Sequence, residues 1–370
     1  MEAGSEPAVG TKLERRLMAI GLHNAIPIGI FDIEYFLPAK VLTSEHISAV
    51  SGLNRQVMEE KLGISCLHVA AEDEAVSDLA VAASERLLQS VAFARSDIDG
   101  IILCTQNPDY KLPATACVVQ SRLGMRKDCL ALDINQGCSG YPYSLAVGAG
   151  LIASGICQNL LLIMSETYSK LVSYKDKTVC GLFGDGAAAT LLRPTPRQGA
   201  GFLGFHFGTD GSGFDRLIVP AGGSRMPPSE RTREMVKDAL GDTRSLEQIH
   251  MHGRDIFEFM DREVPASVKA ALAAASVDPD EVKLFVFHQA NKFMLEFLFR
   301  RMGLTPDRTT ICLKETGNTV SASIPIALKQ AVIQGRVRAG DIVVLCGFGV
   351  GLSWATAVLR WSAKEDWNDS

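Results

Sequence analysis

The chain has 370 residues and a mass of 39.9 kDa, with 47% hydrophobic and 21% charged residues, a balance typical of a globular protein. Its formal net charge of −5 provides no basic surface for nucleic acid or for an anionic membrane. The nine cysteines follow no CxxC spacing, which argues against a disulfide framework or a metal site and favours a reducing, cytoplasmic compartment.

The N-terminal segment does not resemble a targeting signal. Residues 1–25 mix acidic and basic side chains and lack the apolar core and the small-residue cleavage site of a signal peptide. We expect them to form a flexible lead-in with at most a short helix. No later segment approaches the roughly 20 apolar residues that a membrane-spanning helix needs. The sequence therefore predicts no membrane association.

The first structured unit alternates helical patterns with short apolar runs of strand-like composition. In chain order these are a helix over 78–92, strands over 100–105 and 129–134, a helix over 144–154 and a strand over 159–163. Between the second strand and the second helix lies the turn Gly137-Cys138-Ser139-Gly140. This turn places Cys138 at or beside a helix N-terminus, where unpaired N–H groups and the helix dipole favour a thiolate and can bind an oxyanion. A buried structural thiol is the alternative explanation of this cysteine.

The second unit repeats the order of the first. It contains a helix over 268–275, a strand over 284–288 that ends at His288, a polar turn over 315–318, a following helix and a strand over 341–345. In both units a helix runs from a polar turn to a glycine 17 residues later, from Cys138 to Gly155 and from Asn318 to Gly335. A coincidental likeness between helix–strand units is the alternative, since any α/β protein repeats such units.

This alternation predicts two stacked α/β halves that share a central layer of helices. The halves are expected at 26–197 and 198–362, followed by a flexible tail at 363–370. Pseudo-symmetry predicts that Cys138 and Asn318 occupy matching helix starts and face each other, with His288 converging on the same place. Asn318 can also act as a helix cap, and His288 can be a hydrogen-bonded core residue.

Five motifs resemble those of the thiolase superfamily and, within it, the β-ketoacyl-acyl carrier protein synthase III family. They are Asn135-Gln-Gly-Cys138-Ser-Gly, Phe183-Gly-Asp-Gly-Ala187, His288-Gln-Ala-Asn291, Gly317-Asn318-Thr319 and Gly347-Phe-Gly-Val-Gly-Leu-Ser-Trp354. The likeness runs from about residue 26 to 362. It implies a thiolase-like five-layered αβαβα fold of two pseudo-symmetric halves, and a catalytic triad of Cys138, His288 and Asn318. We interpret Asp185, in the second motif, as a residue that orders a turn.

The resemblance implies a condensing acyltransferase with a ping-pong mechanism. Cys138 would take an acyl group from a thioester, and malonyl-acyl carrier protein would then lose CO2 and attack the acyl-enzyme to give a β-ketoacyl thioester. The backbone N–H groups of Cys138 and Val350 would hold the oxyanion. The expected partners are acyl-CoA, acyl carrier protein and a second copy of the chain in a homodimer. No cofactor is expected beyond the CoA and phosphopantetheine thioesters used as substrates.

Several positions depart from the family's pattern at the substrate mouth. Val57 and Lys61 stand where the family commonly has Trp and Arg to grip CoA, and Lys177 and Phe293 stand where it has further arginines. Lysine pairs with phosphate but lacks the planar fork of arginine. Arg254 replaces a smaller polar residue of the pantetheine channel. These changes indicate a primer other than acetyl-CoA.

Two further features bear on the substrate. Leu112 occupies the position of the loop side chain that enters the partner's acyl pocket, often Phe in the family, and its smaller size suggests a longer or branched acyl group. Residues 208–255 are rich in Gly, Pro and mixed charge and read as a mobile loop plus a solvated helix, either a lid on the tunnel or an insertion without a role. Two other functions remain open: a non-decarboxylating acyltransferase of secondary metabolism that uses the same cysteine, and a non-catalytic acyl-binding subunit.

Overall fold

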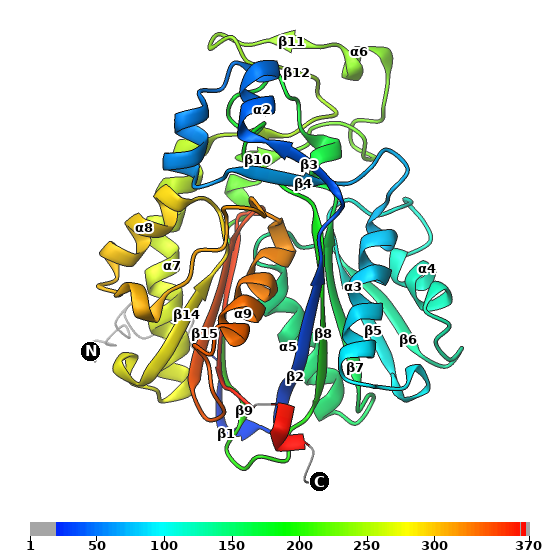
Figure 1. The fold of residues 1–370 in the computed structure, drawn as a ribbon, viewed down its shortest axis with the longest axis vertical. Coiled ribbons are helices and arrows are strands. Elements are labelled where there is room, and N and C mark those ends of the chain that lie inside the picture. Colours follow the sequence, from blue (N-terminus) through cyan, green and yellow to red (C-terminus); the bar gives the residue numbers. More distant parts are fainter. Residues whose placement is uncertain (1–19, 363, 368–370) are drawn as a thin grey trace, which may run out of the picture.

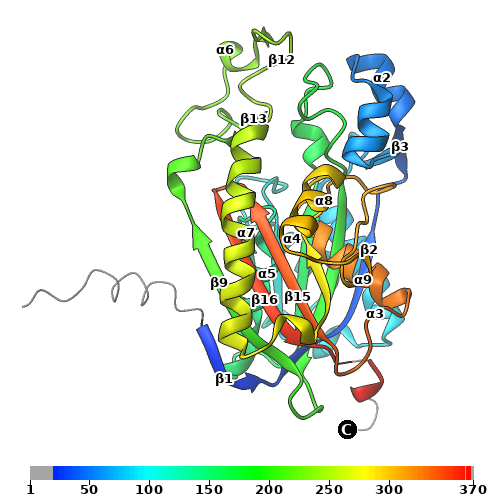
Figure 2. The same ribbon diagram turned by 90° about the vertical axis from the view of Figure 1, so that its left-hand side faces the viewer.

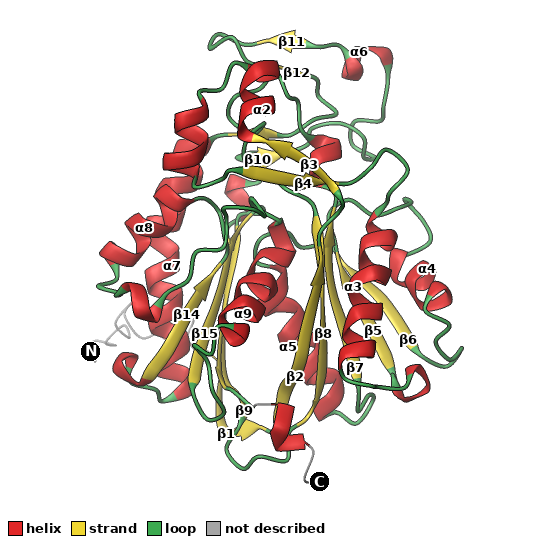
Figure 3. Cartoon of the chain, viewed as in Figure 1, coloured by secondary structure: helices red, strands yellow, loops and turns green. Residues whose placement is uncertain are grey.

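The computed structural model describes residues 20–362 and 364–367. Two mixed β-sheets stand face to face with a layer of helices between them, and further helices cover the outer face of each sheet (Figure 1). Figure 3 shows the alternation of helix, sheet, helix, sheet and helix across the molecule. The predicted five-layered αβαβα fold is therefore confirmed.

The first sheet belongs to the N-terminal half. Its strands run in the order β2-β8-β7-β5-β6 and comprise β2 (Ile28–Phe36), β5 (Gly100–Cys104), β6 (Leu130–Ile134), β7 (Leu160–Glu166) and β8 (Gly186–Pro194). β5 is parallel to β6 and β7, and β8 is antiparallel to β7 and β2. Helices α3 (Val76–Ser90) and α4 (Thr115–Arg122) cover its outer face. Every residue of β5 and β7 is buried, as expected for strands covered on both faces.

The second sheet repeats this topology. Its order is β1-β9-β16-β15-β14, with β1 (Ile20–Ile26), β9 (Gly201–Thr209), β14 (Val282–Phe287), β15 (Ile342–Gly349) and β16 (Ser353–Arg360). β14 is parallel to β15, and β16 is antiparallel to β15 and β9, which matches the directions of β5, β7, β8 and β2. A parallel bridge between Phe285 and Thr309 stands in the place that β6 has in the first sheet. The internal repeat read from the sequence is therefore present.

Helices α7 (Gly253–Ala275) and α8 (Lys292–Arg301) lie outside the second sheet. Figure 2 shows α7 running along the face formed by β9, β16 and β15. The central layer consists of α5 (Gly140–Ala153) and α9 (Ser323–Ile333). Both helices are largely buried because each faces a sheet on either side.

One buried cation joins the central layer to the first sheet. The Nζ atom of Lys329, on α9, lies 2.8 Å from a carboxylate oxygen of Asp32 and 2.8 Å from one of Glu34, both on β2. Lys329 is only 9% exposed, so each partner offsets part of the cost of removing its charge from water.

Smaller elements form a cap over the top of the sheets (Figure 1). They are β3 (Lys40–Thr43), α2 (Ser44–Ser51), the π-helical turn Val57–Leu62, β4 (Cys66–Val69), β10 (Leu217–Ile218), α6 (Glu230–Arg233), β11 (Val236–Lys237), β12 (Thr243–Arg244) and β13 (His250–Met251). Short 3-10 turns occur at Arg95–Asp97, Gly211–Gly213, Pro279–Glu281 and Pro306–Arg308. The solvated helix expected within 208–255 is present as α6, in which only Thr232 is buried. The rest of the segment is not a simple loop, because it also holds two short strand pairs.

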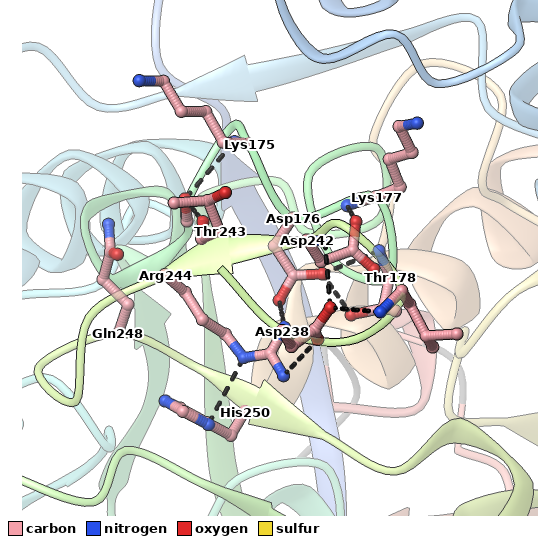
Figure 4. A network of polar contacts seen from close by, with 12 residues as sticks. Lys175, Asp176, Lys177, Thr178, Asp238, Asp242, Thr243, Arg244, Gln248 and His250 are labelled. Atoms are coloured by element: carbon pink, nitrogen blue, oxygen red, sulfur yellow. Dashed lines mark hydrogen bonds and ion pairs between the residues drawn. The ribbon is translucent and has the colours of Figure 1, made fainter. Parts of the chain in front are cut away.

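A buried ion pair fastens this part of the cap to the N-terminal half (Figure 4). The guanidinium of Arg244, on β12, lies 2.9 Å from a carboxylate oxygen of the fully buried Asp176 and 3.0 Å from one of Asp238. Its Nε donates to Nδ1 of His250 over 3.3 Å. The side chains of Lys175 and Lys177 point away from this network. The segment expected to be mobile is therefore held by charge-assisted contacts.

Both chain ends contain more structure than expected. Residues 20–25, which we assigned to the flexible lead-in, belong to β1, which pairs with β9 of the second sheet. Residues Lys364–Trp367, assigned to the flexible tail, form a 3-10 turn, and the buried Trp367 packs edge-on against Phe31 and donates to the Pro194 carbonyl. The rest of both segments lies outside the described residues. Within residues 20–362 and 364–367, no helix is both long enough and apolar enough to cross a bilayer.

Candidate active site

Cys138 lies in the short connection between β6 and α5. The helix begins at Gly140 with Ser139 as its N-cap residue, so the thiol stands just before the first turn. The side chain is 4% exposed and faces the C-terminal end of β15. A Cβ atom on Gly349 would lie 2.7 Å from Sγ of Cys138, and one on Gly347 would lie 2.5 Å from its carbonyl oxygen. Glycine is therefore required at both positions for the two halves to approach at this cysteine.

Two backbone N–H groups are directed at the thiol, those of Val350 and of Cys138 itself. Both lower the pKa of the thiol, but its burial has the larger effect and raises the pKa to about 12. The thiolate expected from the helix start is therefore not the resting form at neutral pH, because desolvation outweighs the two amides. The same pair of donors is well placed for an oxygen that acquires negative charge beside the sulfur.

His288 directly follows β14 and is 2% exposed. Its Nδ1 lies 2.8 Å from the hydroxyl oxygen of Ser323, and its ring packs edge-on against Phe348 with the centroids 5.6 Å apart. Burial lowers the pKa of the imidazole to about 3, so the ring is neutral at physiological pH. In the tautomer whose Nδ1 accepts from Ser323, the other nitrogen, Nε2, carries a proton that it can donate.

Asn318 is held by hydrogen bonds at both ends of its amide. Its Oδ1 accepts from the N–H of Val320 over 2.9 Å, and its Nδ2 donates to the Ala290 carbonyl oxygen over 3.4 Å. Nδ2 also lies 3.4 Å from Nε2 of His288, without a hydrogen bond between the two nitrogens in the tautomer described above. Val320 has a φ of 52°, a rare conformation for a β-branched residue, and it begins the 3-10 turn Val320–Ala322. The side chain therefore binds the start of this turn, whereas α9 begins only at Ser323.

One cavity brings Cys138, His288 and Asn318 together at the junction of the two halves. Its remaining wall is mostly apolar, formed by Leu182, Phe183, Leu217, Met251, Ile256, Met294 and Phe348, with Ala290, Asn291, Gly253 and Gly349 completing it. The nucleophile comes from the N-terminal half, and the histidine and asparagine come from the C-terminal half. An apolar cavity with a thiol and convergent N–H donors suits acyl transfer. Among the residues that the structure describes, no group of three or more His, Cys, Asp or Glu side chains is arranged to hold a metal ion.

Two buried carboxylates lie near the cavity. Asp185 accepts from the N–H groups of Ala70 and Ser169 and from the Ser169 hydroxyl, so it orders the turn before β8, as interpreted from the sequence. Sequence reasoning missed Glu166. It ends β7, is fully buried and accepts from the Ser321 hydroxyl over 2.8 Å. Burial raises its pKa to about 8. The signal available in the sequence was a charged residue three positions after the apolar run 160–163.

The five side chains predicted to bind substrate at the mouth lie outside this cavity. Lys61 and Lys177 are exposed on the cap. The Arg254 side chain is 88% exposed and bonds to Glu258 on its own helix, and Phe293 is 53% exposed and stacks on Phe257. These last two flank the cavity-lining residues Gly253 and Met294, so they lie at the rim. Leu112 is 82% exposed and does not line the cavity of its own chain.

Comparison with known proteins gives one consistent result. The C-terminal domain model of 3-oxoacyl-[acyl-carrier-protein] synthase III matches residues 272–361, and the companion model of this synthase matches residues 132–211. The β-ketoacyl-[acyl-carrier-protein] synthase III of Caldanaerobacter subterraneus subsp. tengcongensis is 37% identical over 337 residues, which cover 91% of this chain and 98% of that protein.

Solved structures agree. The crystal structure of a 3-oxoacyl-(acyl-carrier-protein) synthase III is 38% identical, with a TM-score of 0.88 over 90% of this chain and 99% of the other. The synthase III of Thermus thermophilus is 35% identical, with a TM-score of 0.80 over 90% of this chain and 99% of the other.

Proposed function

The chain belongs to the β-ketoacyl-[acyl-carrier-protein] synthase III family of condensing acyltransferases, and on this premise we propose that Cys138, His288 and Asn318 are its catalytic residues. The observation that carries the proposal is the cavity that holds all three side chains, with the amides of Cys138 and Val350 directed at the thiol. The N-terminal and C-terminal halves, proposed at 26–197 and 198–362, both contribute to it.

In the first step, the sulfur of Cys138 attacks the carbonyl carbon of an acyl thioester. The thiol loses its proton as the new carbon–sulfur bond forms, and the departing thiolate takes up a proton. The carbonyl oxygen becomes negative in the tetrahedral intermediate, where the two amides bind it. Because burial disfavours the free thiolate, these amides contribute most when charge moves from sulfur to oxygen.

In the second step, a malonyl thioester replaces the departed thiol. Breaking its bond to the carboxylate releases CO2 and leaves an electron pair as an enolate, whose oxygen accepts hydrogen bonds from Nε2 of His288 and Nδ2 of Asn318. A neutral imidazole suits this role because it donates without needing a positive charge in a dry cavity. The enolate carbon then attacks the acyl carbonyl on Cys138, and the intermediate collapses by expelling the cysteine thiolate. The product is a β-ketoacyl thioester.

We propose acyl carrier protein as the carrier of the malonyl group, since the related proteins are named as synthases that act on it. The surface around the mouth supports a primer other than acetyl-CoA. Lys61 and Lys177 offer exposed cations for a phosphate, whereas Arg254 is engaged with Glu258 and Phe293 offers only an apolar ring. No cofactor enters these steps. The nine free cysteines support a reducing cytoplasmic location.

We also propose a homodimer that joins the N-terminal sheets. β6 forms one edge of its sheet, and all five of its residues are only partly buried although four are apolar. Uncovered apolar edges of this kind pair readily with a second strand. Leu112 and Phe214, 82% and 62% exposed, are further candidates for contact with the second copy. Sedimentation should give a dimer that Leu112→Asp weakens and Val41→Asp, on β3, leaves intact. A monomeric wild type would exclude this assembly.

The catalytic assignment is tested by intact-mass measurement of the protein after mixing with acyl thioesters, followed by CO2 release from malonyl-acyl carrier protein. We expect an acyl adduct that is absent in Cys138→Ala. His288→Ala and Asn318→Ala should still form the adduct but lose CO2 release. An adduct that survives Cys138→Ala, or none on the wild type, would exclude the nucleophile. An adduct with transfer to another acceptor and no CO2 release would favour the non-decarboxylating acyltransferase.

A further inference from the structure

A second cavity adjoins the catalytic cavity on the side of Val350. Leu217 lines both cavities, and Val350, whose N–H group is directed at Cys138, lines the second. Much of the wall of this second cavity is apolar, including Leu171, Ile218 and Ile249. If Cys138 is the acyl-carrying nucleophile proposed above, on which this inference rests, an acyl group with its oxygen on the Val350 amide extends into this cavity.

Three polar side chains line the same cavity, those of Gln106, Asn135 and Tyr168. Gln106 and Tyr168 bond to each other, with the Tyr168 hydroxyl 2.5 Å from Oε1 of Gln106. Tyr168 is only 5% exposed, and Oε1 of Gln106 is the one hydrogen-bond partner of its hydroxyl among the described residues. This bond fixes the orientation of the side-chain amide, with Oε1 toward Tyr168 and the Nε2 donor on the other side.

The position of Gln106 is closely defined. Its backbone N–H donates to the buried carboxylate of Glu166 over 3.1 Å. A Cβ atom on Gly137 would lie 2.3 Å from Oε1 of Gln106, so the side-chain amide lies directly against the residue that precedes Cys138. A fixed amide is an effective recognition group because little side-chain entropy is lost on binding. Because the Gln106 amide lies beside the residue that precedes Cys138, a substrate atom that bonds to it belongs to one of the first few carbons of an acyl chain on Cys138.

Within the described part of the chain, Nε2 of Gln106 has no hydrogen-bond partner, and none of the residues that line the second cavity is Lys or Arg. A free N–H donor without a nearby cation fits a neutral oxygen better than a carboxylate. We propose that the second cavity selects an acyl primer with a hydroxyl or keto oxygen near its thioester end, a 3-hydroxyacyl group in the simplest case, and that Gln106 is the specificity-determining residue. A purely aliphatic primer leaves this amide unpaired in the occupied cavity.

The test compares 3-hydroxyoctanoyl and octanoyl groups, both presented as N-acetylcysteamine thioesters so that recognition of CoA or carrier protein plays no part. The rate of acyl-adduct formation is followed by intact mass. The wild type should acylate with the hydroxylated group at least about tenfold faster, since a site built to bond an oxygen discriminates against the analogue that lacks it. Gln106→Met, which keeps the length but removes the amide, should abolish the preference. Tyr168→Phe should weaken it by releasing Oε1, and the exposed Gln89→Met serves as the matched control.

The outcomes separate this inference from the catalytic proposal. Absence of both adducts on the wild type would overturn the nucleophile and, with it, the primer assignment. Adducts that form equally fast, or faster with octanoyl, would overturn the primer assignment and leave Cys138 as the nucleophile. A preference that persists in a folded Gln106→Met protein would remove Gln106 from the recognition site. Melting temperatures of all variants establish that the proteins compared are folded.

Discussion

Replacing Gly349 by alanine tests the steric basis of the site. A Cβ atom there would lie 2.7 Å from both Cβ and Sγ of Cys138. Because nonbonded carbon contacts are optimal at about 3.5–4.0 Å, either the thiol or the β15 loop must move by about 1 Å. A displacement of this size at a reacting group costs about 10²-fold in rate. The overpacking should also lower the free energy of unfolding by about 1–3 kcal/mol.

The assay combines intact-mass acylation kinetics with urea denaturation. Gly150→Ala is the matched control, because Gly150 is exposed on α5, the helix that follows Cys138, and its Cβ would meet no described heavy atom within 4 Å. It should leave acylation unchanged and stabilise the helix by up to about 1 kcal/mol. The destabilisation by Gly349→Ala should shrink in a Cys138→Gly background, since that glycine removes both clashing atoms. Wild-type stability and acylation in Gly349→Ala would refute the reasoning.

Three further predictions concern charge. Arg244→Met leaves the buried Asp176 without its cation and should lower the free energy of unfolding, measured by urea titration, by about 3 kcal/mol. The control Arg262→Met removes an exposed ion pair and should be nearly neutral. Equal losses in the two variants would show that the Arg244–Asp176 pair does not stabilise the fold. Because the pKa of Cys138 is about 12, its alkylation by iodoacetamide, measured on the Cys138 peptide, should rise about tenfold per pH unit from about pH 7 to 10, and a plateau in this range would show a lower pKa. Burial raises the pKa of Glu166 from 4.5 to about 8, so between these pH values the folded state retains a proton that the unfolded state releases. The melting temperature should therefore fall as pH rises from about 4.5 to 8. An equally steep fall in Glu166→Gln would assign the pH dependence to other groups.

The arrangement of layers could be predicted from the sequence because it depends on patterns within short segments. Continuous apolar runs such as 160–163 identify strands covered on both faces. The equal spacing of Cys138 from Gly155 and of Asn318 from Gly335 reflects the repeated strand directions of the two sheets. The juxtaposition of Cys138, His288 and Asn318 in one cavity follows from that repeat.

Features that depend on distant contacts could not be predicted in this way. The protonated state of Cys138 results from burial by residues of both halves, which no local pattern reports. The strand pairs within 208–255 are held by the bond from Arg244 to Asp176, 68 positions earlier in the chain. Trp367 is ordered by Phe31 and Pro194. In each case the partner lies far away in sequence.

Glu166 and Gln106 show the same limit at the level of function. A single glutamate at the end of one apolar strand, β7, or a glutamine two positions after the end of another, β5, does not stand out in the sequence. The two residues become informative only when the fold places the Glu166 carboxyl group against the backbone N–H of Gln106, and the Gln106 side chain against Gly137.

The position of β1 has a consequence for how the chain is made. This strand is synthesised before the N-terminal sheet, yet it pairs with β9, whose residues follow only after that whole sheet has been synthesised. The backbone N–H and C=O groups of β1 have no strand partner until about 180 further residues have been synthesised. The entropic cost of closing so long a loop grows only slowly with its length. The N-terminal sheet can fold during that interval without competing for β1. Once β9 is in place, β1 pairs with it and becomes part of the C-terminal sheet. The two halves then cannot separate without first breaking the hydrogen bonds between β1 and β9.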